Sequence, residues 1–81
     1  MTRDAAVDLI ARCLRNIAPE VELDQVEPSE PLADELDLDS MDLISLYEAL
    51  HEATGLELPE SDYNQFNTLD GAVGYLTARL P

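Results

Sequence analysis

Ser40 is the residue of this sequence best placed to do chemistry, because it stands between two carboxylates in the run Asp39-Ser40-Met41-Asp42. The run joins an acidic stretch to a segment whose apolar residues recur at helical spacing, so the hydroxyl is expected on the solvent side of a helix start. There it can cap the helix, a common role of serine, or be modified by another enzyme. No Glu or Gln stands at position 43, so a reciprocal capping box is not expected. Capping and modification remain compatible, because a hydroxyl at a helix entrance is exposed.

Neither catalysis nor metal binding is expected at this serine. The only histidine, His51, lies about 16 Å away along a single helix, too far to act as its base. The acidic run that starts at Glu35 has Ser40 where a calcium loop needs glycine and Leu46 where it needs a bidentate glutamate. No cysteine–histidine cluster or phosphate-binding glycine loop is present. We therefore expect neither an enzyme nor a metal site.

The charge of the chain indicates which partners it can meet. Eighteen acidic residues face four arginines and no lysine, which gives a formal net charge of −14. Such a chain repels nucleic acid and anionic membrane surfaces and attracts basic partners. Ten of the acids lie between positions 20 and 42 and lead directly into Ser40. This placement favours a docking surface for a basic partner over a merely solubilising face.

Length and composition suit one small packed domain that covers residues 1–81. The chain has 81 residues, of which 46% are hydrophobic, enough for a core. Its apolar runs are too short to cross a membrane, and no signal-peptide pattern opens it. The single Cys13 excludes an internal disulfide, falls on an apolar helical face and fits a reducing compartment. We expect a cytoplasmic monomer with a buried thiol.

Three apolar stripes at helical spacing predict three longer helices. Pro19 is expected to end the first helix, Gly55 to end the second, and Thr68 to cap the third. Pro59 is expected to open a short helical turn that runs to Tyr63. No segment alternates apolar and polar residues long enough to predict a strand. The predicted fold is all-α, a small four-helix bundle of three longer helices and one short helix. The stripes are Val7-Ile10-Leu14-Ile17, Leu43-Leu46-Tyr47-Leu50 and Leu69-Ala72-Val73-Leu76-Leu80.

Residues 18–39 are expected to form a long ordered loop between the first two long helices. Three prolines, at positions 19, 28 and 31, argue against a continuous helix there. Valines and leucines recur through the same segment and are expected to hold it against the core. One short turn is expected within it, because a structureless loop of this length is unusual in a compact domain.

Taken together, these features resemble the acyl and peptidyl carrier proteins, which bear a 4′-phosphopantetheine arm on one serine. The resemblance covers essentially the whole chain and implies that a phosphopantetheinyl transferase attaches the arm to Ser40, using coenzyme A. Cargo would then be held as a thioester. The matching residues are Asp39-Ser40-Met41-Asp42, Leu46, Ala49-Leu50, Glu52, Leu58-Pro59 and the closing segment from Thr68-Leu69 to Leu76.

The same resemblance implies how partners would recognise the chain. Partners would be the transferase, acyl or aminoacyl ligases, and synthase or transferase enzymes with basic docking patches. Met41 would supply an apolar side chain beside the arm. The acidic residues implied in partner binding are Asp39, Asp42, Glu48 and Glu52. Candidates for lining a cargo site between helices, whose ordinary role is core packing, are Leu46, Leu50, Tyr63 and Phe66.

Some positions depart from the carriers of fatty acid synthesis. Those carriers usually read Gly-Ala-Asp-Ser-Leu where this chain reads Asp37-Leu38-Asp39-Ser40-Met41, and Tyr47 occupies a usually aliphatic position. These departures favour a specialised, discrete acyl carrier in fatty acid, lipid or specialised metabolite synthesis over a housekeeping one. One alternative is an aminoacyl carrier loaded by a stand-alone amino acid ligase. Another, of a different class, is an acidic helical interaction module without a prosthetic group.

Overall fold

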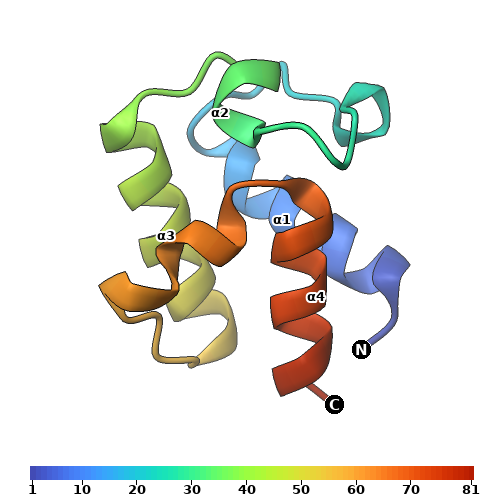
Figure 1. The fold of residues 1–81 in the computed structure, drawn as a ribbon, viewed down its shortest axis with the longest axis vertical. Helices are drawn as coiled ribbons and strands as arrows, with labels where there is room; N and C mark the ends of the chain where they lie inside the picture. Colours follow the sequence, from blue (N-terminus) through green and yellow to red (C-terminus); the bar gives the residue numbers. More distant parts are fainter.

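The computed structural model describes all residues from Met1 to Pro81 and is helical throughout, without β-strands (Figure 1). The predicted all-α class is confirmed. The three apolar stripes become α1, α3 and α4, and the short helix after Pro59 becomes the 3₁₀ segment η2. In chain order the elements are α1 (Arg3–Arg15), η1 (Leu23–Gln25), α2 (Leu32–Glu35), α3 (Ser40–Thr54), η2 (Glu60–Phe66) and α4 (Leu69–Arg79).

Helix α1 begins at a side-chain cap and ends before the predicted boundary. The Thr2 hydroxyl accepts a hydrogen bond from the Ala5 N–H at 3.1 Å. At the other end, the N–H groups of Ile17 and Ala18 both donate to the Leu14 carbonyl, at 2.9 and 2.7 Å. Because these bonds tighten the last turn, the helix ends at Arg15. The sequence had predicted that it would continue to Pro19.

The crossover between α1 and α3 is ordered, as expected, but it contains two short turns, η1 and α2, rather than one. Leu23, Val26 and Leu32 are buried and hold it against the core. Two backbone hydrogen bonds join it to the start of α4. The Leu32 N–H donates to the Asn67 carbonyl at 2.7 Å, and the Asp70 N–H donates to the Pro28 carbonyl at 3.0 Å. Contacts distant in sequence therefore shape this segment.

The core consists of 18 buried residues, all hydrophobic, with no buried polar or charged side chain among them. Helix α1 contacts both α3 and α4, and η2 packs against α4. Aromatic rings fill the space between α3, η2 and α4: the centroids of Tyr47 and Phe66 are 5.6 Å apart, and those of Phe66 and Tyr75 are 4.8 Å apart. Cys13 is buried as predicted, and burial raises the pKa of its thiol.

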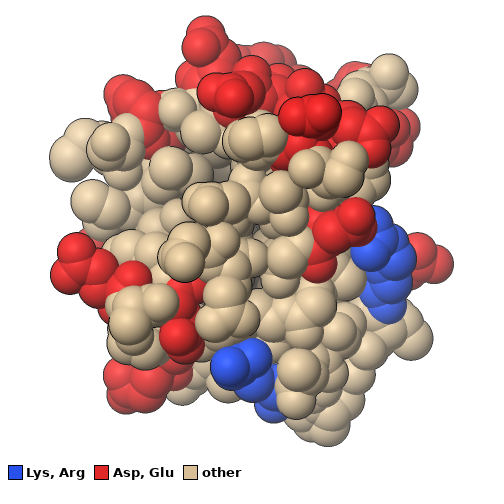
Figure 2. Space-filling view, viewed as in Figure 1, with Lys and Arg blue, Asp and Glu red and all other residues tan.

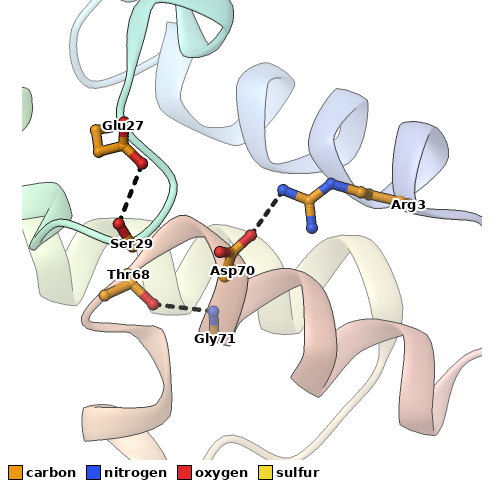
Figure 3. A network of polar contacts seen from close by, with 6 residues as sticks. All are labelled: Arg3, Glu27, Ser29, Thr68, Asp70 and Gly71. Atoms are coloured by element: carbon orange, nitrogen blue, oxygen red, sulfur yellow. Dashed lines mark hydrogen bonds and ion pairs between the residues drawn. The ribbon is translucent and has the colours of Figure 1, made fainter.

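The start of α4 is held by side chains from two elements (Figure 3). The Thr68 hydroxyl accepts from the Gly71 N–H at 3.0 Å, which confirms the predicted cap. The Arg3 guanidinium donates to the Asp70 carboxylate at 2.7 Å and ties α1 to α4. In the neighbouring crossover, the Ser29 hydroxyl donates to Glu27 at 3.1 Å. These contacts fix the helix start that anchors the crossover.

The start of α1 and the end of α4 lie near each other, so the two ends of the chain are close together (Figure 1). The terminal ammonium of Met1 donates a hydrogen bond to the Leu80 carbonyl at 3.2 Å. No helix combines the length and the apolar character needed to cross a lipid bilayer.

Candidate functional site

The start of α3 is capped by Asp39, and not by Ser40 as the sequence suggested. The Asp39 carboxylate accepts from the Asp42 N–H at 2.9 Å, and the Asp42 carboxylate accepts from the Asp39 N–H at 3.3 Å. This is a reciprocal capping box, so the expectation that none would form was wrong. The error was one of register: the cap lies one residue earlier, and an aspartate takes the place of the usual Glu or Gln.

Ser40 is consequently the first residue within the helix, where its hydroxyl is not needed as a cap. The residue is exposed, and its hydroxyl makes no hydrogen bond to another protein group. Just before it, Asp37 adopts a positive φ of 55°, a left-handed conformation that is uncommon for a residue with a side chain. This turn brings the crossover into the capping box. The arrangement presents an unoccupied hydroxyl at a rigid helix start.

An apolar pair lies on α3 next to this hydroxyl. Met41 is 70% exposed and Ile44 is 43% exposed, and they are the two large hydrophobic side chains that the chain leaves in solvent. Their spacing of three residues puts them on neighbouring positions of one helix face. Ile44 was not identified from the sequence. The sequence feature that could have revealed its exposure is its position outside the buried stripe of Leu46, Tyr47 and Leu50.

The acidic residues named from the sequence are spread along α3: Asp39 caps it, Asp42 is in its first turn, and Glu48 and Glu52 follow Ile44 in later turns. Asp39, Glu48 and Glu52 are exposed, and Asp42 is half-buried in the capping box. None of them forms a salt bridge, because the two that the chain makes join Arg3 to Asp70 and Arg12 to Asp8. In Figure 2 acidic side chains gather over the top of the molecule, around α2 and its flanking loops, and again at the lower left beside α3 and η2. The surface of α3 thus combines exposed carboxylates with one exposed apolar pair beside Ser40.

A pocket opens farther along α3, where the loop after Gly55 folds back into η2. Of the four residues considered for a cargo site, only Tyr63 lines it. Leu46, Leu50 and Phe66 are each at most 1% exposed and belong to the closed core, their ordinary role. The lining residues are Tyr47, Glu48, His51 and Glu52 of α3, Glu57 and Leu58 of the loop, and Tyr63 of η2.

His51 has a local structural contact at this end of the helix. Its Nδ1 lies 2.6 Å from the Leu56 carbonyl oxygen, just beyond the left-handed Gly55 that ends α3 as predicted. The histidine is therefore at the opposite end of α3 from Ser40. No set of three or more His, Cys, Asp or Glu side chains is arranged to hold a metal ion.

Comparison with known proteins places this arrangement in a family. Residues 8–76 match the family model described as a phosphopantetheine attachment site. An acyl carrier protein of Rubrobacter xylanophilus is 34% identical over 56 residues, which cover 69% of this chain and 69% of that protein. The chain belongs to the acyl carrier protein family, whose members are carriers rather than catalysts. Their cofactor is a covalent 4′-phosphopantetheine, and they work with phosphopantetheinyl transferases and synthase enzymes.

Proposed function

We propose that Ser40 bears the 4′-phosphopantetheine arm and that the chain presents an acyl-type intermediate on it to partner enzymes. One observation carries this proposal. The capping box of Asp39 and Asp42 satisfies the helix start and leaves the intervening Ser40 hydroxyl exposed and without a hydrogen-bond partner. A hydroxyl in that state is free to act as a nucleophile. The positive end of the α3 dipole also partly offsets repulsion between an attached phosphodiester and the flanking carboxylates.

Attachment uses the Ser40 hydroxyl as the nucleophile on coenzyme A. Its oxygen forms a bond to the phosphorus next to the pantetheine, 3′,5′-adenosine diphosphate leaves, and the serine proton passes to a base of the transferase. The base and the metal come from the transferase, because the only histidine of this chain is at the other end of α3. The attached group supplies a thiol on which cargo is held as a thioester. Because coenzyme A is the donor, we expect the reaction in the cytoplasm.

The surface around Ser40 is suited to docking on basic enzymes. Met41 and Ile44 offer apolar area beside Ser40, and the exposed carboxylates of Asp39, Glu48 and Glu52 lie before and after them along the chain. In such an interface the charges raise the association rate, while the buried apolar side chains contribute most of the affinity. Ile44 thereby joins the residues proposed from the sequence, which are Asp39, Met41, Asp42, Glu48 and Glu52.

Intact mass after incubation with coenzyme A and a promiscuous transferase tests the proposal. The wild-type chain should gain one phosphopantetheine unit, and Ser40→Ala should gain none. Ser45→Ala is the matched control, since it removes an exposed hydroxyl from the same helix and should leave the mass gain unchanged. A wild-type chain that several transferases leave unmodified would instead favour an interaction module without a prosthetic group.

A further inference from the structure

We propose that Leu38 is a positioning residue for the modification of Ser40, an inference that rests on the proposed attachment of the arm to that serine. The side chain of Leu38 is buried in the core and is not part of the surface offered to partners. It acts through the connection that leads into α3. Because Leu38 holds this connection in place, the Ser40 hydroxyl keeps a fixed position for the docked transferase.

Helices α2 and α3 are joined by a very short connection. Leu36 is the C-cap of α2, and Asp39 is the N-cap of α3. Only Asp37 and Leu38 lie between these two caps. Asp37 is exposed, whereas Leu38 is buried. Leu38 is therefore the one side chain between the caps that can anchor the connection to the core.

Leu38 completes the end of α2. Its N–H donates to the Ala33 carbonyl at 2.9 Å, and the residue before it, Asp37, has a left-handed φ of 55°. This combination is typical of a Schellman motif, in which the second residue beyond the C-cap bonds back to the helix across a left-handed residue. An apolar side chain at that second position frequently packs against the helix end. The backbone bond and the burial of Leu38 together determine how the chain leaves α2.

Leu38 also determines how the chain enters α3. It directly precedes the N-cap Asp39, and Leu43 is the fourth residue of the helix. Apolar residues at these two positions often pack on each other as a hydrophobic staple, which fixes the entry angle of the chain. Leu38 belongs to the hydrophobic core, and Leu43 packs against that core. Loss of the Leu38 side chain should therefore loosen the first turn of α3, which contains Ser40.

Helix α2 is a firm base for this connection. Its first residue, Leu32, is buried, and the Leu32 N–H donates to the Asn67 carbonyl at 2.7 Å, just before α4. Through Leu38 the start of α3 is thus tied to the start of α4. Helix ends without such support fray, because their terminal backbone groups lack partners within the helix. A frayed first turn would hold the Ser40 hydroxyl less precisely, and group transfer depends on reacting atoms that are held in position.

Single-turnover loading of the full chain, with coenzyme A and an excess of a promiscuous phosphopantetheinyl transferase, tests the role of Leu38. Leu38→Ala should lower the loading rate at saturating transferase about tenfold, since a displacement of about 1 Å can cost up to about a hundredfold. The transferase concentration at half-saturation should stay near the wild-type value, because Ile44, Glu48 and Glu52 lie beyond the first turn of α3. Leu38→Met, which keeps an apolar side chain of similar volume, should restore the rate.

Leu9→Ala is the matched control. Leu9 and Leu38 are both 9% exposed, and Leu9 lies beside Ala53 at the far end of α3. This truncation should lower stability but leave the loading rate unchanged at a temperature where the variant is fully folded. If Leu38→Ala does not fold, Leu38→Val and Leu9→Val give the same comparison with a smaller deletion. Equal loading rates in the Leu38 and Leu9 variants would overturn the positioning role, as would a change in half-saturation alone.

Amide hydrogen exchange provides a readout that is independent of the transferase. The N–H groups of Asp42 and Leu43 bond back to Asp39 across the first turn, at 2.9 and 3.1 Å. Both should exchange faster in Leu38→Ala than in Leu9→Ala, relative to the amides farther along α3. Equal exchange in the two variants would overturn the positioning role alone. A wild-type chain with a protected first turn that no transferase loads would overturn the proposed function, and the positioning role with it.

Discussion

Asp39 and Asp42 hydrogen-bond each other across the first turn of α3, with each carboxylate accepting from the backbone N–H of the other residue at 2.9 or 3.3 Å. Ser40 lies between them in the sequence and takes part in neither bond. Helix stabilisation and the availability of the hydroxyl therefore depend on different residues. Substitutions can separate the two properties.

Asp39→Ala is expected to lower the free energy of unfolding by about 1 kcal/mol, the usual cost of losing a side-chain cap. Ser40→Ala should change it by less than about 0.5 kcal/mol, because an exposed hydroxyl without partners is removed. Urea denaturation of both variants provides the measurement. If Ser40→Ala proved as unstable as Asp39→Ala, the serine would be acting as a cap after all.

Two glycines of α4 form a matched pair for a test of packing. A Cβ on Gly71 would collide with the backbone oxygen of Gln65, whereas a Cβ on Gly74 would meet nothing within 4 Å. Gly71→Ala should therefore destabilise the fold by about 1–3 kcal/mol. Gly74→Ala should stabilise it by about 0.5–1 kcal/mol, since alanine favours a helix and restricts the unfolded chain. Thermal denaturation gives the melting temperature of each variant. If both melting temperatures rose, or both fell, relative to the wild type, this account would be contradicted.

The left-handed residue before the capping box gives a third prediction. Asp37 has a φ of 55°, and glycine adopts such a conformation without steric cost. Asp37→Gly should keep or slightly raise stability, while Asp37→Val should lower it by about 1–2 kcal/mol, because a β-branched side chain is strained there. Guanidinium denaturation compares the three proteins. A valine variant as stable as the wild type would mean that the turn relaxes to another conformation.

Tyr75 should make the fold sensitive to alkali. Burial raises the pKa of this tyrosine above its ordinary value of 10.0, and its hydrogen bond to Asp62 raises it further. Below about pH 10 the phenol is neutral in the folded and in the unfolded chain, so its contribution to stability is fully present. Above it, the unfolded chain loses the proton first, so stability falls as pH rises toward the folded-state pKa.

Urea midpoints measured from about pH 9 to pH 11 would follow this loss. Tyr75→Phe should weaken the dependence on pH, although it also removes the bond to Asp62 and lowers stability at neutral pH. An identical alkaline slope in the variant and the wild type would exclude Tyr75 as a cause.

Ile44→Ala should reduce the kcat/KM of a phosphopantetheinyl transferase about tenfold, as expected for an apolar side chain near the centre of an interface. Gln25→Ala, an exposed change on η1, is the control and should have no effect. Both variants should retain the wild-type melting temperature. If Ile44→Ala were modified at the wild-type rate, docking would have to rely on the charged residues and Met41.

The long helices were predictable because burial of an apolar stripe determines them, and the stripes of α1, α3 and α4 are regular. The two turns of the crossover were not, since the Leu32 N–H finds its partner at Asn67, a contact between residues distant in sequence. The stacking of Tyr47 on Tyr63 arises in the same way, because the loop between α3 and η2 brings them together. Local patterns identify elements, and tertiary contacts decide how the connections are shaped.

At the site, residue types identified the region but not the role of each residue. Aspartate and serine are both favoured caps, and sequence alone does not distinguish a cap at position 39 from one at position 40. The backbone conformation distinguishes the two, because Asp39 is extended and Ser40 is already helical. Ile44 escaped notice since an apolar residue within a helix is normally assigned to the core. Its exposure follows from its angular position relative to Leu46 and Leu50, which are buried.

The hydrogen bond between Met1 and Leu80 brings the two ends of the chain together, at the opposite end of the molecule from the start of α3 (Figure 1). A tag or a solid support joined to either end would therefore leave the Ser40 face turned outward. Sensor surfaces prepared through the first or the last residue should give equivalent orientations. The same proximity makes the chain suited to circular permutation, with new ends opened in an exposed loop.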